Sequence, residues 1–235
     1  MNPSLVGSEM CIRDSTRLIR VLICLGILSV AGIPFASQIY AFVASPLLDI
    51  LPVGSSMIAT QVTSPFMAPL KLVLFTALLI TMPYLFYEIW MFMSPGLYKN
   101  EKSFVAPLMV STILLFSAGV AFAYLVVLPI IFKFFIGVAP ESIQVMTDIN
   151  QYLSFVIKLI FAFGIAFEIP VATFLLIRTG IVKKESLIKA RPYLIILFFV
   201  IGMLLTPPDI FSQLFLAIPM WILFELGLLF SKNSS

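Results

Sequence analysis

Histidine is absent from the sequence, and cysteine occurs only twice, at Cys11 and Cys24. The lack of imidazole side chains excludes histidine-based acid–base catalysis and histidine-ligated metal sites. Cys24 lies within a hydrophobic run and Cys11 within an N-terminal stretch of different character, so no disulfide framework is expected. The hydrophobic runs also carry no Ser/Lys dyad, paired aspartates or cluster of metal ligands, so an enzyme acting within them is not indicated.

Charge is also scarce. Asp, Glu, Lys and Arg make up 11% of the 235 residues, whereas 61% are hydrophobic and the mean hydropathy is +1.14. A soluble domain of this size could not hide so much apolar surface, so we expect an integral membrane protein surrounded by the lipid bilayer. The net charge of +3 is small, and no basic face with interleaved polar residues is present, which excludes a nucleic-acid-binding surface.

Six apolar runs predict an all-α protein with six transmembrane helices. Gly32 and Pro34 are expected to kink the first run, and Pro129 is expected to close the third. The fifth run is about 21 Å long as a helix, at roughly 1.5 Å per residue, and is too short to cross the hydrocarbon layer alone. The last two runs are therefore predicted to form a short hairpin. The runs cover residues 18–42, 66–93, 104–128, 152–177, 192–205 and 212–230.

Two aspartates stand shortly before predicted helices. Asp148 lies near the end of the connection 133–150, which also contains Glu141, and Asp209 precedes the sixth run. Because an aspartate accepts backbone N–H groups at a helix N-terminus, each is expected to cap its helix. For Asp209 a binding role is also open.

The first 15 residues, MNPSLVGSEMCIRDS, do not resemble the rest of the chain. They are polar, lack a helical period, and lack the order of regions found in a signal peptide. We predict that residues 1–15 are a foreign or disordered segment. Residues 16–230 then form the transmembrane domain, and residues 231–235 form a short tail.

The fourth run carries one carboxylate, Glu168, within an otherwise apolar stretch, and Pro170 follows it two residues later. If Arg178 marks the membrane surface, Glu168 lies about 15 Å deeper, near the middle of a layer about 30 Å thick. A carboxylate there is costly unless it is protonated, paired or hydrated, which predicts a functional site. The alternative is a protonated side chain that only bonds a neighbouring helix. Pro170 frees the carbonyl of Ala166 and predicts a kink.

Four strings, in order and in register with the six runs, carry a resemblance to a known family. They are PLLDILP at 46–52, FMSPGLYKNE at 92–101, FEIP at 167–170, and TPPDIFSQ at 206–213 followed by LAIP at 216–219. Together they resemble the TatC family of the twin-arginine protein translocase, over nearly the whole length from Arg17 to Phe230. Each string is weak alone, whereas the four in register are specific.

The resemblance implies a fold and a function. Members of the family are six-helix, concave, glove-shaped membrane proteins with two short final helices. They are the signal-peptide receptor of a system that exports folded proteins across the prokaryotic plasma membrane, driven by the proton-motive force. The implied partners are twin-arginine signal peptides, single-span subunits of the TatA and TatB type, and further copies of the same chain. No cofactor and no enzymatic activity are implied.

The resemblance also assigns roles to particular residues. Glu101, in an otherwise basic loop, stands where the family binds the signal, and a carboxylate is the best partner for a guanidinium group. Without the resemblance, Glu101 would be interpreted as a solvated acid that balances Lys99 and Lys102. The implied signal-binding residues are Glu101, Arg17, Pro95 and Leu97; Glu168 is the polar site within the membrane; Thr206 and Gln213 are docking positions for partner helices; Pro46, Asp148, Asp209 and Glu88 are structural or lesser candidates.

One family element is missing. The N-terminal string His-Leu-x-Glu-Leu-Arg-x-Arg, a second recognition element, matches only in its last residue, Arg17. Thr16 precedes it, while Ser15 and Arg13 stand where Arg and Glu are expected. This departure puts signal binding by this chain in question, unless residues 1–15 replace the native start.

A proton-coupled secondary transporter that uses Glu168 is the alternative function. The short chain, the missing inverted repeat and the single buried acid argue against it. Co-purification discriminates the two, because a translocase protein retains a twin-arginine precursor and loses it when both arginines become lysine.

The basic residues set the orientation. They gather in the N-terminal segment, in residues 94–103 and 178–191, and in the tail, and only Lys71, Lys133 and Lys158 lie elsewhere. Since Lys and Arg are enriched in cytoplasmic loops, six spans with both termini in the cytoplasm are expected.

Cysteine probes test this topology. Probes at Ser55 and Glu141 are expected to react with an impermeant reagent in intact cells, whereas probes at Asn100 and Ser186 react only after permeabilisation. Labelling of Asn100 in intact cells would contradict the six-span arrangement.

Overall fold

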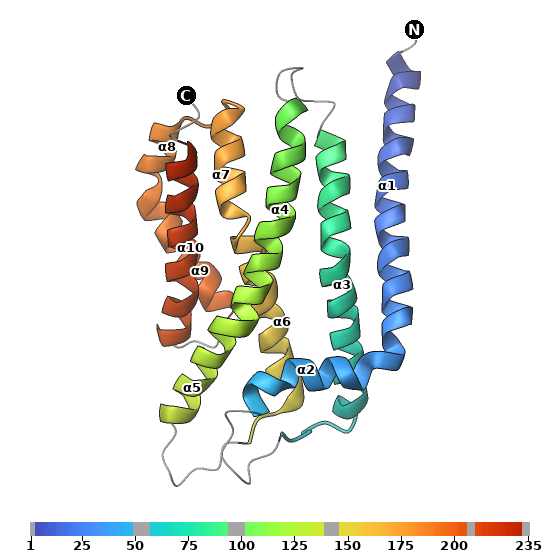
Figure 1. Ribbon diagram of the computed structural model, residues 1–235, viewed down its shortest axis with the longest axis vertical. Helices are drawn as coiled ribbons and strands as arrows, with labels where there is room; N and C mark the ends of the chain where they lie inside the picture. The colour runs from blue at the N-terminus through green and yellow to red at the C-terminus, as the bar shows by residue number, and fades with distance from the viewer. Residues whose placement is uncertain (1–2, 49–56, 94–101, 139–145, 206–209, 232–235) are drawn as a thin grey trace. The chain divides into compact units, whose positions relative to one another are not determined.

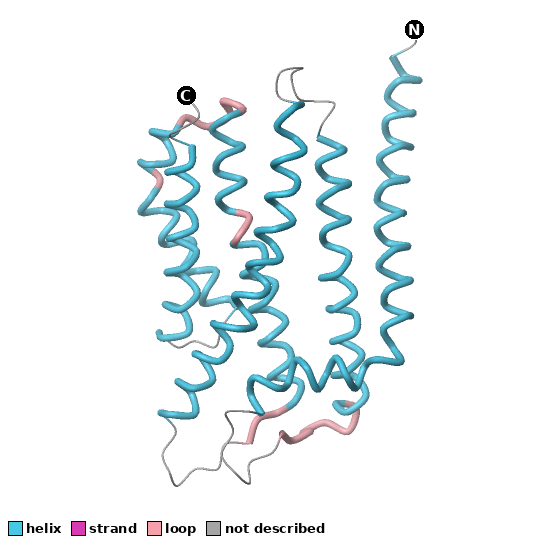
Figure 2. Tube along the Cα trace, viewed as in Figure 1, coloured by secondary structure: helices cyan, strands magenta, loops and turns pink. Residues whose placement is uncertain are grey.

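The computed structural model describes residues 3–48, 57–93, 102–138, 146–205 and 210–231, and these are almost wholly helical (Figures 1 and 2). Within the described residues the sole β-pairing is an isolated bridge between Ile58 and Asp148. Five helices are long and apolar enough to cross a membrane, and a sixth apolar helix, Arg191–Leu205, is shorter. The expected all-α class is confirmed. The chain divides into two compact units, residues 1–42 with 66–113 and residues 43–65 with 114–235.

The first unit contains α1, a sharp turn, the start of α2, most of α3 and the start of α4 (Figure 1). The short 3₁₀ turn η1 separates α1 from α2, and α2 runs in a different direction from α1 (Figure 1). Pro34 lies in this turn, so the kink predicted at Gly32 and Pro34 is confirmed. The helices cover α1 Pro3–Gly32, η1 Ile33–Phe35, α2 Ala36–Leu48, α3 Ser64–Met93 and α4 Lys102–Phe122.

Residues 3–15 are helical and form the N-terminal part of α1, which continues into the first apolar run. The expectation that this segment is foreign concerns its origin and stays a prediction. A genomic read across the N-terminus tests it.

Polar side chains join α3 and α4 inside the first unit. The indole N–H of Trp90 donates to the hydroxyl of Thr112 at 3.3 Å, and both residues are buried. Thr81, also buried, donates to the carbonyl of Ala77 one turn back at 2.7 Å. Each polar group is thus bonded within protein, as a low-dielectric surrounding requires.

The second unit holds the end of α4, the π-helical turn η3 and the remaining helices (Figure 1). α10 packs against α7 and α9. The elements cover η3 Ala123–Val127, α5 Leu128–Val138, α6 Ile149–Ala166, α7 Ile169–Arg178, α8 Lys184–Lys189, α9 Arg191–Leu205 and α10 Ile210–Phe230.

The expected end of the third span at Pro129 is wrong. The helix bends at η3 and continues as α5 to Val138, so Lys133 lies in helix and not in a connection (Figure 1). Pro129 has no N–H to give to a carbonyl in the preceding turn. The π turn lies directly before it, where the N–H of Leu128 bonds to the carbonyl of Ala123, five residues back. This wider turn shifts the register and lets the proline enter without ending the helix.

The fourth span is divided, as Pro170 predicted. α6 ends at Ala166, and α7 begins at Ile169, with Phe167 and Glu168 between them. Glycine allows α6 and α4 to approach closely below this break, since a Cβ on Gly119 would lie 2.6 Å from the carbonyl oxygen of Phe163. A Cβ on Gly227 of α10 would likewise lie 2.9 Å from the Cα of Pro170. Small residues therefore set the close helix contacts on both sides of the break.

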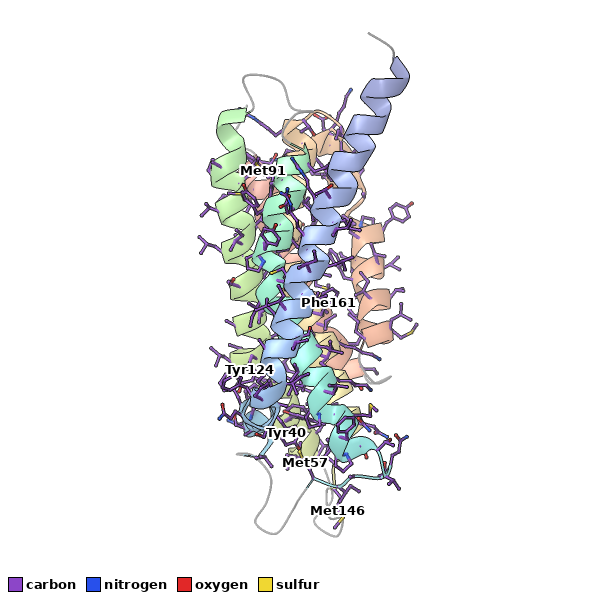
Figure 3. The ribbon with its side chains drawn as sticks, turned by 90° about the vertical axis from the view of Figure 1, so that its right-hand side faces the viewer. Tyr40, Met57, Met91, Tyr124, Met146 and Phe161 are labelled. Carbon is purple, nitrogen blue, oxygen red and sulfur yellow. The ribbon has the colours of Figure 1, made fainter. Side chains whose placement is uncertain are left out.

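The start of α6 is tied to residues 57–64. The carboxylate of Asp148 accepts the N–H of Gln151 at 3.0 Å, which confirms the predicted N-cap, and it accepts the hydroxyl of Thr60 at 2.6 Å. The Thr60 hydroxyl, followed by the N–H groups of Gln151 and Thr60, holds the pKa of Asp148 below its usual value. Figure 3 shows Met57 and Met146 at the same end of this unit, with Phe161 farther along it.

α9 and α10 form the predicted short hairpin. The side-chain amide of Gln213 in α10 donates to the carbonyl of Phe199 in α9 at 2.8 Å. At the other end, Arg191 and Glu225 form an ion pair at 2.7 Å, and the ammonium of Lys184 donates to the carbonyl of Leu228. Asp209, the expected cap of the sixth run, lies outside the described residues.

The Gln213 amide is expected to stabilise the hairpin. Gln213→Leu removes the bond to Phe199 and should lower the thermal unfolding midpoint in detergent, by an effect of about 0.6 kcal/mol and at most about 2 kcal/mol for such a bond. Gln38→Leu, the same change at an exposed site in α2, is the control. An unchanged midpoint for Gln213→Leu would show that the bond contributes nothing.

Candidate functional site

The residues singled out by the sequence fall into two groups. Glu101, Pro95, Leu97, Thr206 and Asp209 lie outside the described residues. The described candidates are Arg17, Glu88, Pro46, Asp148, Glu168 and Gln213.

Arg17 of α1 and Glu88 of α3 lie together in the first unit. The Arg17 Nε and the Glu88 Oε2 are 3.8 Å apart, and the side chains are 21% and 12% exposed. The hydroxyl of Tyr84 donates to the Glu88 Oε1 at 2.9 Å, because residues four apart share one face of a helix. Figure 3 shows Met91, three residues beyond Glu88, near one end of α3, whereas Tyr40 lies at the opposite end of the unit. The cluster is therefore close to one terminus of α3.

A cavity of about 330 Å³ opens beside this pair. Apart from the guanidinium and the carboxylate, its walls are aliphatic and aromatic. They are formed by Arg17, Leu18 and Val21 from α1 and by Leu85, Glu88, Ile89 and Phe92 from α3.

The ion pair is incomplete. A separation of 3.8 Å is longer than a charge-assisted hydrogen bond, which is usually about 2.7 to 2.9 Å. The Arg17 Nη1 is buried and has no hydrogen-bond partner. A buried donor that lacks an acceptor costs about 1 to 3 kcal/mol. The arrangement can accept a closer ligand for either charge.

Glu168 lies at the break between α6 and α7. It is half-buried, and it occupies the N-cap position of α7 with φ −80° and ψ −13°, without a side-chain bond to the helix N-terminus. Its backbone carbonyl accepts the N–H of Ala172 at 2.9 Å. The N-terminal end of α7 carries a partial positive charge, which favours a negatively charged side chain there. On the α6 side, the ring of Phe167 packs on that of Phe122 with centroids 5.6 Å apart.

The remaining candidates have structural partners. Pro46 lies inside α2 and is half-buried. Asp148 caps α6 and binds Thr60, and Gln213 is bonded within its hairpin to Phe199. These bonds within the protein explain the positions of Asp148 and Gln213 without any ligand. The binding roles expected for these residues stay predictions.

The sequence did not reveal the pairing of Arg17 with Glu88. The sequence marks Glu88 only as a lesser candidate of unknown direction. The i, i+4 spacing of Tyr84 and Glu88 was the available local signal. The contact with Arg17 joins residues far apart in the chain and needed the packing of α1 on α3. Among the described residues, no group of three His, Cys, Asp or Glu side chains could hold a metal ion.

Comparison with known proteins places the chain among protein translocases. The family model "Sec-independent protein translocase protein (TatC)" matches residues 14–219. A relative of that name from Azotobacter chroococcum mcd 1 is 55% identical over 218 residues, 93% of this chain and 86% of the relative. The relative from Escherichia coli (strain K12) is 50% identical over 216 residues, which are 92% of this chain and 84% of that protein.

The fold agrees with a solved structure. A crystal structure described as the twin arginine translocase receptor TatC superimposes with a TM-score of 0.85 at 34% identity, over 95% of this chain and 98% of the other. The apolar helices and the bacterial relatives make the chain a multi-pass membrane protein. A secondary transporter is not supported, and the family is a component of a translocase, not an enzyme family. The chain belongs to the TatC family of Sec-independent protein translocases.

Proposed function

We propose that this chain is the signal-peptide-binding core protein of a twin-arginine translocase, which exports folded proteins using the proton-motive force. The observation that carries the proposal is the likeness over 95% of the chain to a structure described as the twin arginine translocase receptor. The proposed surroundings are the prokaryotic plasma membrane, with both termini in the cytoplasm, because the basic residues gather in the segments assigned to that side.

The signal is proposed to bind at the cytoplasmic end of α3. In this proposal Glu101 accepts a guanidinium of the signal, Pro95 and Leu97 belong to the same binding segment, and Arg17 belongs to the site from α1. A carboxylate can accept two parallel hydrogen bonds from a planar guanidinium, whereas a lysine ammonium lacks the paired donors for that geometry. This difference explains how such a site would distinguish arginine from lysine.

Crosslinking to a twin-arginine precursor tests the role of Glu101. Glu101→Ala should weaken crosslinking while the protein still inserts, because a hydrogen bond to a charged group contributes about 1.5 to 3 kcal/mol. Glu185→Gln, which neutralises an exposed acid of α8 in the segment assigned to the same side, is the control. The assignment would be refuted if Glu101→Ala crosslinked as strongly as the wild-type chain, provided that the wild-type chain crosslinks to the twin-arginine precursor and not to its twin-lysine form.

Single-span subunits of the TatA and TatB type are the proposed partners, docked at Thr206 and Gln213, together with further copies of this chain. The hairpin supports this proposal because a cavity of about 210 Å³ lies between α9 and α10. Its walls are formed by Ile195, Phe198, Phe199, Ala217, Ile218 and Trp221.

The Gln213→Leu variant also tests partner docking. If Gln213 docks a partner, the variant changes which of two competing partner helices is retained. If the variant and the wild-type chain prefer the same helix to the same extent, Gln213 has no docking role and serves only in the hairpin.

Glu168 is proposed to line a partly hydrated, concave face. A carboxylate directed into lipid would have no partner, whereas the helix break supplies polar backbone groups that can share one wet pocket. Its half-buried position beside that break supports this role.

Two variants test Glu168. If a hydrogen-bonding group suffices, Glu168→Gln should retain substantial export and Glu168→Ala should not; if charge is needed, both should fail. Export of a folded reporter, normalised to the amount of inserted protein, is the measurement. Parental export by the Ala variant would overturn the proposal.

A further inference from the structure

Two cross-helix ion pairs in the described chain differ in the distance between their charged groups. Arg191 and Glu225 meet at 2.7 Å, the length of a charge-assisted hydrogen bond. Arg17 and Glu88 remain 3.8 Å apart, although both side chains are more buried than those of the closed pair. The more buried pair would be expected to be the tighter one, because desolvated charges need close partners. Glu88 is thus a largely desolvated carboxylate whose cationic partner is held loosely.

The surroundings of Glu88 suit a guanidinium other than that of Arg17. Tyr84 already donates to Oε1, which fixes the carboxylate and leaves Oε2 directed to the cationic partner. The Arg17 nitrogen that lies 3.8 Å from Oε2 is Nε, the inner nitrogen of the guanidinium, and the Nη1 of Arg17 is buried without an acceptor. The Nε of Arg191 also lacks an acceptor, so the longer separation of the charges is what distinguishes the Arg17 pair. The adjoining cavity of about 330 Å³ has room for an incoming side chain. A second guanidinium that approached through this cavity could present its nitrogens directly to Oε2.

The position along the chain links Glu88 to the proposed signal site. Glu88 lies five residues before the end of α3 at Met93, which is about 7.5 Å at the usual rise per residue. The segment with Pro95, Leu97 and Glu101 follows directly. A signal with two arginines has two guanidinium groups, and Glu101 supplies one carboxylate.

Building on the proposed function, we propose that Glu88 is a second guanidinium acceptor for the signal peptide, and that Arg17 is a resident cation which the signal displaces. In the unliganded chain Arg17 offsets the charge of Glu88 without closing on it. On binding, an arginine of the signal takes the carboxylate, its stem and neighbouring apolar residue fill the cavity, and the guanidinium of Arg17 moves toward water. The incomplete pair keeps the site charged and available.

Binding of labelled signal peptides to the full chain in nanodiscs tests this. The peptides carry Arg-Arg, Arg-Lys, Lys-Arg or Lys-Lys at the twin position. Glu88→Gln should weaken Arg-Arg binding by about tenfold or more, as expected when a hydrogen bond to a charged group is lost. One of the two single-Lys peptides should then bind Glu88→Gln and wild type nearly equally, because it already lacks the arginine that Glu88 accepts. Glu185→Gln is the matched control and should leave binding unchanged.

Arg17→Gln separates displacement from a structural pair. If Arg17 is displaced, its removal should strengthen Arg-Arg binding by a few-fold; if the pair only holds α1 to α3, both Arg17→Gln and Glu88→Gln should weaken all four peptides alike, with a lowered unfolding midpoint. The second pattern overturns the proposal, as does wild-type binding by Glu88→Gln. Failure of the proposed function looks different, because the wild-type chain would then bind Arg-Arg and Lys-Lys peptides equally before any variant is made.

Discussion

The absence of water from the hydrocarbon layer is the constraint on which this structure depends. Each backbone N–H and C=O in the layer must bond within the protein, and helices satisfy that demand locally. Prolines within the apolar runs disturb it, because each removes one donor. Three of these prolines accompany an interruption in the described chain: a 3₁₀ turn at Pro34, a π turn before Pro129, and a full break before Pro170. Others, such as Pro83 and Pro219, lie inside continuous α-helices. Of these three interruptions, only the last has an acidic side chain, Glu168, directly before it, which supports the proposed role of that residue.

Polar side chains within the helices follow the same constraint. Trp90 bonds Thr112, and Gln213 bonds the carbonyl of Phe199, so the polar atoms that apolar surroundings would penalise join one helix to the next. Such bonds hold the helices in place without a large hydrophobic driving force, which lipid does not supply. The Nη1 of Arg17 has no such bond, which fits the proposal that the signal displaces Arg17 toward water.

The proposed recognition of a charged signal by this TatC-family chain draws on a difference between its two described ion pairs. Arg191 with Glu225 closes the α9–α10 hairpin, whereas Arg17 with Glu88 leaves a guanidinium and a carboxylate beside an open apolar cavity. Carboxylates distinguish arginine from lysine through paired hydrogen bonds, and desolvation strengthens each contact. The same chemistry that stabilises one helix pair can thus serve recognition at another.

The sequence alone determined the helical class, the six apolar runs, the kinks at Pro34 and Pro170, the Asp148 cap and, through four motifs in register, the family. These follow from local features: hydrophobic length, proline chemistry and capping. The sequence did not predict that the helix continues past Pro129, because the π turn that accommodates this proline has no signature in the sequence. It also left Glu88 without a partner. Only the tertiary structure could decide that α1 brings Arg17 to α3, since a contact between residues so far apart in the chain has no local signature.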